Sequence, residues 1–292
     1  MGHGHSHGNP SEIGERRLWW AVGANILLTL AQIIGGIISG SLSLIADALH
    51  NFSDAASLLI ALVAIRIGRK PPDKFKTFGY KRAETVAALI NLTTLIIIGL
   101  YLCYEAIMRF ITPEPIAGWT IVIVAGIALV VDVFTALLTY SQSKNSMNIR
   151  AAFLHNLTDA LASVGVIIAG TLILLYGWIW TDAAMTLLIA GYVLYHGIVE
   201  IPKVIHLLME GTPEGIDLND VVQSMETIDG VNNVHHVHIW QIDENRNALE
   251  AHAVISDVSK MDQIKKSLKT MLHDQFEIEH STLEFETQNC NY

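Results

Sequence analysis

The sequence predicts an all-α membrane domain of six transmembrane helices, followed by a small cytoplasmic α+β domain with the element order αββαβ. The 292 residues are 51% hydrophobic and only 16% charged, with a mean hydropathy of +0.41, which is typical of a membrane protein. Long apolar windows fill residues 16–208, and the pattern becomes amphipathic across residues 209–292. These observations set the two main domains, after a His-rich tail at residues 1–15 that is expected to be flexible.

The apolar windows predict helices at residues 18–39, 41–66, 80–110, 118–142, 148–176 and 179–208. Each is long enough to cross about 30 Å of hydrocarbon at 1.5 Å per residue. The first window follows Arg16 and Arg17, as in a signal peptide, but it is too long and lacks a cleavage site of small residues. We therefore interpret it as a retained span.

Basic residues predict the orientation. Segment 66–82 is rich in Lys and Arg, whereas the turns at 39–42 and 176–180 carry no charge. The positive-inside rule then places segment 66–82, Arg16 with Arg17, and the connection 144–150 in the cytoplasm. Both termini are therefore expected in the cytoplasm, and the short loops suggest a bacterial inner membrane.

The charge and cysteine content narrow the possible partners. The net charge of −10 comes mainly from the last ninety residues, and an acidic surface argues against binding nucleic acid. Cys103 and Cys290 are too few for a disulfide framework. The expected partners are the lipid bilayer, divalent metal ions and a second copy of the chain.

The C-terminal segment alternates between two periods. Leu218, Val221 and Met225 recur at helical spacing behind Asp217, a plausible N-cap. Strands are predicted at 233–242, 247–256 and 280–287, and a second amphipathic helix begins near Met261. The core of so small a domain is marginal alone, so dimerisation is expected to support it.

Two copies of one motif carry the functional prediction. His50-Asn-Phe-Ser-Asp54-Ala in the second window is nearly repeated as His155-Asn-Leu-Thr-Asp159-Ala in the fifth. In each copy the His and the Asp share a helix face, one turn apart. An ionised Asp in the bilayer costs about 3 kcal/mol, so such a repeated pair needs a reason.

A tetrahedral site for a divalent cation is that reason. Counted from opposite ends of their windows, His50 and His155 lie about 13 Å and about 10 Å into the membrane, so the pairs meet near its middle. Two neutral imidazoles and two carboxylates cancel the charge of the ion. Protons compete for the same ligands, which is the minimum chemistry of an antiporter. The alternative is that these groups only form hydrogen bonds between helices.

Other intramembrane polar residues have simpler interpretations. Asn51 and Asn156 are expected to bond across helices or to groups that surround the metal ligands. Asp47 could widen the path to the site or relay protons, and Asp132 could assist or be structural. Asp182 is interpreted as the N-cap of the sixth helix.

The chain resembles the cation diffusion facilitator family. The resemblance rests on segments 43–54, 78–84, 155–159 and 207–213. It implies a homodimer with six helices per subunit and a ferredoxin-like cytoplasmic domain. It also implies that the protein exports Zn²⁺ or a similar ion from the cytosol in exchange for protons. It assigns the transport site to four residues: His50, Asp54, His155 and Asp159. Family members with His at position 50 lean toward zinc, whereas those with Asp accept cadmium more readily.

One loop departs from the family pattern. Some members bind a second metal between spans two and three through an Asp and two His. Here Asp73 is kept, but Lys76 and Tyr80 occupy the matching positions, so we expect that site to be absent.

Histidines in the C-terminal domain suggest another metal site. With a four-residue turn between the first two strands, His235 and His252 fall on one face as diagonal neighbours. On the last strand His280 and Glu286 share a face. The resemblance points to ligands at His235, His252 and either His280 or Glu286.

The other two histidines of the first strand are predicted to lie away from this group. His236 and His238 are expected on the opposite face, with Trp240. A register slip of one residue would exchange the faces. The alternative is that these side chains are surface or interface groups without an ion. His3, His5 and His7 could gather metal weakly or have no role.

The expected function is a Zn²⁺/H⁺ antiporter that exports zinc from the cytosol by alternating access and contributes to metal resistance. Zinc is then the transported substrate and a possible regulatory ion of the C-terminal domain, and protons are the counter-ion. No enzymatic activity is expected, because the sequence contains no HExxH motif. The alternatives are a metal-sensing membrane receptor or scaffold and an intramembrane metalloenzyme.

Overall fold

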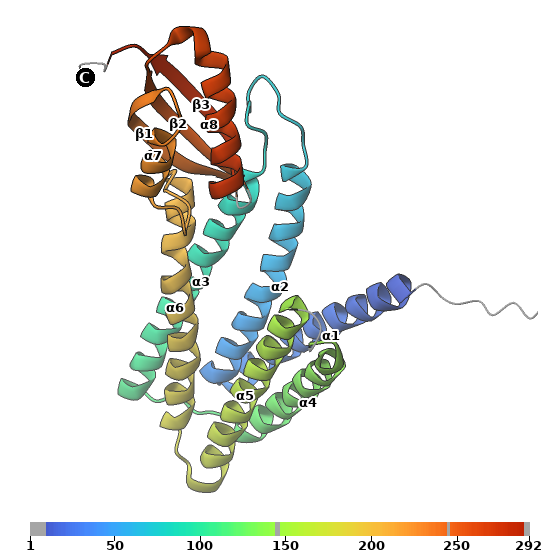
Figure 1. The fold of residues 1–292 in the computed structure, drawn as a ribbon. Helices are drawn as coiled ribbons and strands as arrows, with labels where there is room; N and C mark the ends of the chain where they lie inside the picture. The colour runs from blue at the N-terminus through green and yellow to red at the C-terminus, as the bar shows by residue number, and fades with distance from the viewer. Residues whose placement is uncertain (1–9, 144–146, 244–245, 289–292) are drawn as a thin grey trace, which may run out of the picture. The chain divides into compact units, whose positions relative to one another are not determined.

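The computed structural model describes residues 10–143, 147–243 and 246–288. Within its helices, the side chains of residues 10–22, 24–25, 58, 138–143, 147–152 and 155 lie outside this description. The described chain forms two compact units (Figure 1). One comprises the residues up to Ile60 together with Asn91–Val199, and the other comprises Ala61–Ile90 together with the residues from Glu200 onward. Of the predicted tail, residues 1–9 lie outside the described residues, and the chain is helical from Pro10.

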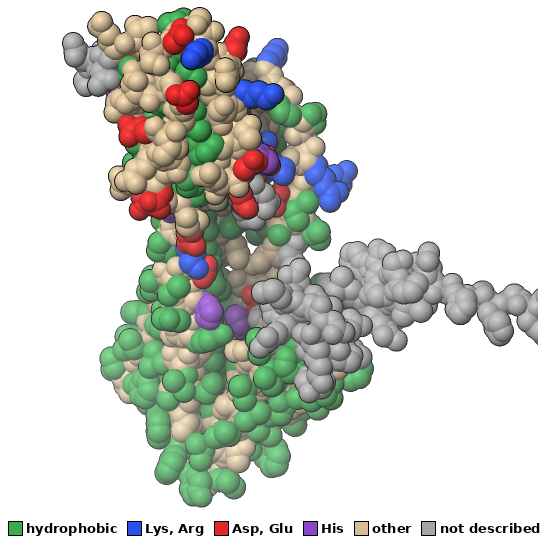
Figure 2. Space-filling model, viewed as in Figure 1, with side chains coloured by type: hydrophobic (Ala, Val, Ile, Leu, Met, Phe, Trp, Pro, Cys, Tyr) green, Lys and Arg blue, Asp and Glu red, His purple; other side chains and the backbone are tan. Residues whose placement is uncertain are grey.

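Long helices make up the first part of the chain. They are α1 (Pro10–Ser39), α2 (Leu42–Gly68), α3 (Arg82–Ile111), α4 (Gly118–Ser143), α5 (Met147–Tyr176) and α6 (Trp180–Leu208). In the described residues, five of them, α2 to α6, are long and apolar enough to cross a membrane, and the apolar part of α1 is Ile26–Ser39. Where Figure 2 shows described side chains of these helices, they are mostly apolar, as expected where lipid replaces water.

Small residues allow the helices to approach closely. Gly170 of α5 lies against α4, where an added Cβ would come within 2.9 Å of Ile121 Cγ2. The buried core joins residues of α2, α3, α4, α5 and α6, among them Leu44, Leu102, Val166 and Ile189. Helices pack in membranes through such close contacts, because apolar lipid supplies no hydrophobic drive between them.

The start of α2 is held by a residue of α6. The buried carboxylate of Asp182 accepts hydrogen bonds from Ser41 Oγ at 2.5 Å and Ser43 Oγ at 2.6 Å, and from the backbone nitrogen of Leu42 at 2.8 Å. Asp182 lies inside α6, which begins at Trp180. The prediction of an N-cap for the sixth helix was therefore wrong, because Asp182 instead satisfies the free amide donors of a neighbouring helix.

The C-terminal part has the predicted order of elements. They are α7 (Leu218–Glu226), β1 (Val231–Asp243), β2 (Arg246–Ile255), a 3₁₀ turn η1 (Val258–Lys260), α8 (Met261–Phe276) and β3 (Ile278–Glu286). The sheet order is β1-β2-β3. Strand β2 pairs with β1 in the antiparallel direction and with β3 in the parallel direction. As predicted, Asp217 caps α7 and accepts a hydrogen bond from the backbone nitrogen of Asn219 at 2.7 Å.

Both helices of this part pack on one core. Val221 and Met225 of α7 and Leu268 and Leu272 of α8 meet the sheet residue Leu249, and all five are fully buried. The amphipathic spacing read from the sequence therefore places both helices against the sheet, as Figure 1 shows.

The register of β1 on β2 differs from the prediction. His235 lies directly opposite His252, and pairing then shifts before resuming at His238 and Glu250. The irregularity contains His236, which has a left-handed φ of 54°. This extra residue is a β-bulge, and it changes which side chains share a face.

Candidate metal sites

The intramembrane motif places an imidazole between two carboxylates. His50 Nε2 lies 3.6 Å from Asp54 Oδ2 on the next turn of α2 and 3.5 Å from Asp159 Oδ1 on α5. Asp159 is buried, and His50 and Asp54 are half-buried. The structure therefore brings together three of the four predicted transport-site residues. His155 lies one turn before Asp159 in α5, and its side chain lies outside the described residues.

A buried polar chain adjoins this site. Gln32 of α1 donates its Nε2 hydrogen to Asp47 Oδ2 at 2.6 Å, and its Oε1 accepts a hydrogen bond from Asn51 Nδ2 at 3.1 Å. Asn51 thus bonds across helices, as predicted. The sequence analysis missed Gln32, and its only signal was that it is one of two amide side chains, with Asn25, in the first apolar window.

Two further buried acids, Asp47 and Asp132, belong to the surroundings of this site. Asp47 interacts electrostatically with His50, Asp132 and Asp159. Asp132 Oδ2 accepts a hydrogen bond from Ser163 Oγ at 3.1 Å, and both side chains are buried. Asp47 thus interacts with two other buried carboxyl groups, Asp132 and Asp159. A cation near them would be favourable, because uncompensated charges in a low-dielectric region are costly.

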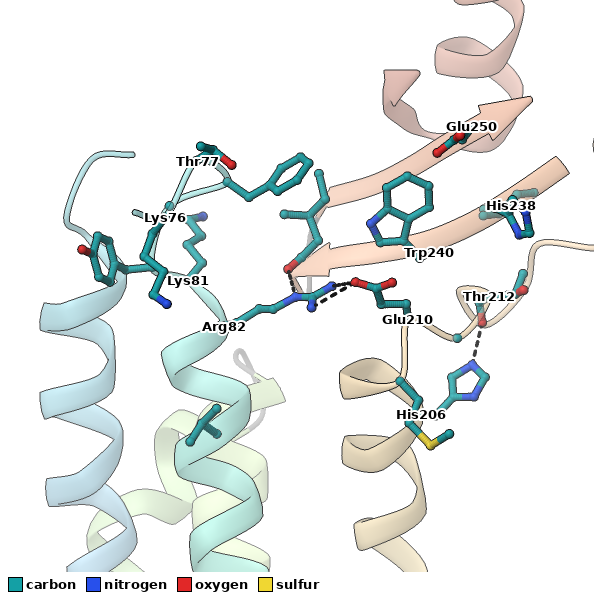
Figure 3. A pocket seen from close by; sticks show the side chains of 18 of the residues that line it. Lys76, Thr77, Lys81, Arg82, His206, Glu210, Thr212, His238, Trp240 and Glu250 are labelled. Carbon is teal, nitrogen blue, oxygen red and sulfur yellow. Dashed lines mark hydrogen bonds and ion pairs between the residues drawn. The ribbon is translucent and has the colours of Figure 1, made fainter. Parts of the chain in front are cut away.

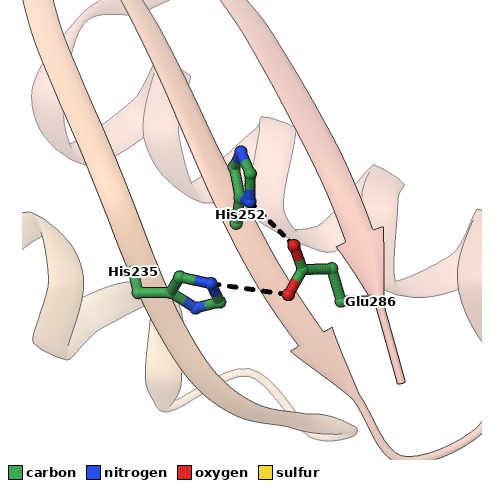
Figure 4. A group of neighbouring side chains, drawn as sticks. All are labelled: His235, His252 and Glu286. Carbon is green, nitrogen blue, oxygen red and sulfur yellow. Dashed lines mark hydrogen bonds and ion pairs between the residues drawn. The ribbon is translucent and has the colours of Figure 1, made fainter. Parts of the chain in front are cut away.

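The C-terminal domain contains a second group of metal-ligand side chains. Glu286 of β3 lies between two histidines, with Oε1 2.8 Å from His252 Nδ1 and Oε2 3.4 Å from His235 Nε2 (Figure 4). Among the described residues, this is the group whose three ligand atoms all lie within 4.8 Å of one another. The ligand atoms of His50, Asp54 and Asp159 do not all lie within 4.8 Å of one another.

This His₂Glu set suits a borderline cation such as Zn²⁺. Imidazole nitrogen and carboxylate oxygen are both zinc ligands, and three protein ligands leave a fourth position open. All three side chains are half-buried, so an ion held here remains accessible from water.

The bulge in β1 places the neighbouring histidines differently from the prediction. His236 does not point away from His252, because the two rings stack with centroids 5.2 Å apart and an angle of 26°. The ring centroids of His238 and His236 lie 5.8 Å apart. The predicted separation of faces was wrong because it assumed a regular strand of period two.

His280 lies apart from this group. It pairs with Ala248 near the start of β3, and its ring makes an edge contact with Phe78 at 5.7 Å between centroids. Of the two residues that the resemblance offered on the last strand, the structure therefore places Glu286 beside His235 and His252.

In the loop before α3, the carboxylate of Asp73 accepts hydrogen bonds from other residues of the same loop. Asp73 Oδ2 accepts a hydrogen bond from Tyr80 Oη at 2.6 Å, and Oδ1 accepts from the backbone nitrogens of Phe75 and Lys76 at 2.8 and 2.9 Å. The Tyr80 hydroxyl, with these amides, lowers the pKa of Asp73 below its usual value. Asp73 thus organises the loop.

Known proteins resemble the chain over its whole length. Residues 18–209 match the family described as "Cation efflux transmembrane domain", and residues 213–288 match "Cation efflux protein, cytoplasmic domain". A cadmium, cobalt and zinc/H(+)-K(+) antiporter of Bacillus subtilis (strain 168) is 39% identical, with 100% of this chain and 94% of that protein covered. The zinc transporter ZitB of Escherichia coli (strain K12) is 36% identical, with 100% and 94% covered.

One further relative and one solved structure are also similar. The metal cation efflux system protein CzcD of Cupriavidus metallidurans is 36% identical, with 99% of this chain and 92% of that protein covered. The solved metal-bound C-terminal domain of a CzcD transporter is 33% identical, covering 24% of this chain and 99% of that domain at a TM-score of 0.23. The relatives named here are transport proteins.

Proposed function

The chain belongs to the cation diffusion facilitator family of cation efflux proteins, and we propose that it is a Zn²⁺/H⁺ antiporter that exports zinc from the cytosol. The observation that carries this proposal is the His50 imidazole, which lies within 3.6 Å of two carboxylates from different helices. His155 completes a tetrahedral set of two imidazoles and two carboxylates. Relatives named for zinc, and in one case for zinc and protons, support the same substrate and counter-ion.

Charge balance couples the two ions. With zinc bound, two neutral imidazoles and two carboxylates neutralise the ion, so the filled site is inexpensive to bury. When zinc leaves, the same ligands take up protons, because an empty site of ionised carboxylates is costly in the membrane. Rocking of the helices between inward-open and outward-open states then exchanges zinc for protons across the bilayer.

The arrangement in the membrane follows from the same proposal. The apolar part of α1, together with residues before Ile26, completes six spans with α2 to α6. The transporter lies in a bacterial inner membrane with both termini in the cytoplasm, and the C-terminal domain supports a homodimer. The His235–His252–Glu286 group binds cytosolic zinc as a regulatory or stabilising ion.

Transport by the full-length protein tests the proposal. In proteoliposomes with an internal zinc-sensitive dye and an imposed proton gradient, the wild type is expected to accumulate zinc. Asp54→Ala and Asp159→Ala each remove one carboxylate beside His50 and are expected to reduce accumulation to that of liposomes without protein. Binding without accumulation by the wild type would contradict antiport.

A matched control separates the site from a general loss of negative charge. Asp220→Ala removes an exposed carboxylate from the first turn of α7, and it should leave zinc accumulation unchanged. Wild-type transport by both the Asp54 and Asp159 variants would reject the proposed site.

A further inference from the structure

The loop between α2 and α3 is strongly basic although the chain is acidic. Residues 69–81 contain five Lys or Arg residues and one acid, Asp73, whereas the whole chain has a net charge of −10. Both flanking helices are long and apolar enough to cross a membrane. The loop therefore emerges from the bilayer at each of its ends, and its charges lie close to lipid head groups.

The loop has a defined shape that presents its cations outward. The oxygens of Asp73 accept their hydrogen bonds from Tyr80, Phe75 and Lys76, all within the loop. Lys74 Nζ lies 4.9 Å from the centre of the Phe75 ring. Phe75 is 76% exposed. A cation above an exposed aromatic ring is the combination that lies favourably at a membrane surface.

The same loop forms one wall of a large cavity. Residues from Phe75 to Arg82 line a cavity of about 1190 Å³, with Trp240 and Glu250 on another wall (Figure 3). Arg82 is engaged there, since its guanidinium contacts Glu210 at 3.3 Å and the carbonyl oxygen of Ile242 at 3.2 Å. In the part of the chain that the structure describes, Lys76 and Lys81 form no ion pair, so their ammonium groups can meet an anion.

We propose that loop 69–81 is a docking surface for the head groups of anionic phospholipids. The ammonium groups of Lys74, Lys76 and Lys81 contact lipid phosphates. Charge complementarity and the position of the loop between two membrane helices single out this occupant. The inference requires membrane insertion of α2 and α3, and it does not depend on which ion is transported.

A simpler role would be to orient the helices during insertion. That role needs the charge of the loop but no selective contact with a lipid in the finished protein. The two possibilities therefore differ in whether the folded protein prefers anionic over zwitterionic lipid.

The test counts lipids retained by the full-length protein. The protein is reconstituted in nanodiscs of equal parts phosphatidylcholine and phosphatidylglycerol, and the lipids that remain bound on release are counted by native mass spectrometry. The wild type is expected to retain mainly phosphatidylglycerol. In Lys74→Gln/Lys76→Gln this preference should fall roughly thirtyfold at low salt, since each lysine near an anionic surface contributes about a fivefold factor.

The chain offers a matched control. Lys265→Gln/Lys266→Gln removes two exposed lysines from α8, which is not joined to a membrane helix at either end, and should keep the wild-type preference. All four side chains are exposed, so both variants should fold, as their thermal unfolding will show. No preference in the wild type, no loss in the loop variant, or an equal loss in the control would overturn the proposal.

Discussion

His236 shows how one residue can set the geometry of a metal site. Its φ of 54° is left-handed, a conformation that costs a non-glycine residue about 1–2 kcal/mol. The bulge that contains it brings His235 directly opposite His252. The strain therefore has a structural consequence, because it aligns two of the three side chains proposed to hold an ion.

Replacing His236 tests this role without removing a proposed ligand. A β-branched residue is a severe outlier at positive φ, so His236→Val should displace the bulge and weaken zinc binding about 10–100-fold, as loss of a supporting residue does. Calorimetric zinc titration of the full-length protein measures this effect, in an Asp159→Ala background that silences the transport site.

His238→Val is the matched control for this prediction. It removes an imidazole from the same strand, at a position where regular pairing with Glu250 has resumed. This variant should bind zinc as the background protein does. Equal affinities for the two valine variants would show that the bulge does not position the ligands.

At the scale of elements, α2 matters most because it carries Asp47, His50 and Asp54. Its first turn is fixed by Asp182, whose fully buried carboxylate accepts from Ser41, Leu42 and Ser43. The turn before α2 is also fixed. Gly40 has a left-handed φ of 71°, and its carbonyl oxygen accepts a hydrogen bond from the guanidinium of Arg109 in α3. Neighbouring helices thus anchor α2 eight residues before His50.

Loss of this anchor should destabilise the protein strongly. Asp182→Ala leaves the buried donors of Ser41, Leu42 and Ser43 unsatisfied, at a cost of about 3 kcal/mol or more. Asp217→Ala removes only the exposed cap of α7, at a cost of about 1 kcal/mol. The melting temperature of the detergent-solubilised protein should therefore fall further for Asp182→Ala, and a smaller fall than for Asp217→Ala would contradict this account.

At the scale of the whole molecule, polarity divides the chain into two environments. Where Figure 2 shows described side chains of the long helices, they are mostly apolar, whereas charged side chains gather on the unit formed by Ala61–Ile90 and the residues from Glu200 onward. The loop of residues 69–81 is basic, and the connection between α3 and α4 carries only Glu114. The positive-inside rule therefore predicts that these two loops lie on opposite sides of the membrane.

Cysteine labelling tests that orientation with a matched pair. In a background lacking Cys103 and Cys290, Thr112→Cys and Thr77→Cys place one thiol in each loop, at exposed positions. A membrane-impermeant maleimide should label Thr112→Cys in intact cells and Thr77→Cys only after permeabilisation. The reverse pattern would invert the proposed direction of transport.

The sequence alone determined the elements and the repeated motif. Apolar length predicted the helices from α2 to α6 within about two residues, and changing periodicity predicted the order αββαβ. These features are local, because a span must match the bilayer and a helix or strand repeats its own period. The pairing of His with Asp one turn later is local too, and for that reason the motif itself identified His50 and Asp54.

Only the tertiary structure decided which distant groups meet. Asp159 beside His50, Gln32 on Asp47, and Asp182 at the start of α2 each depend on how separate helices pack. The bulge at His236 and the choice of Glu286 over His280 depend on strand register, which one backbone angle can shift. Neither helix packing nor a single left-handed residue leaves a periodic trace in the sequence, and this is why these contacts could not be predicted from it.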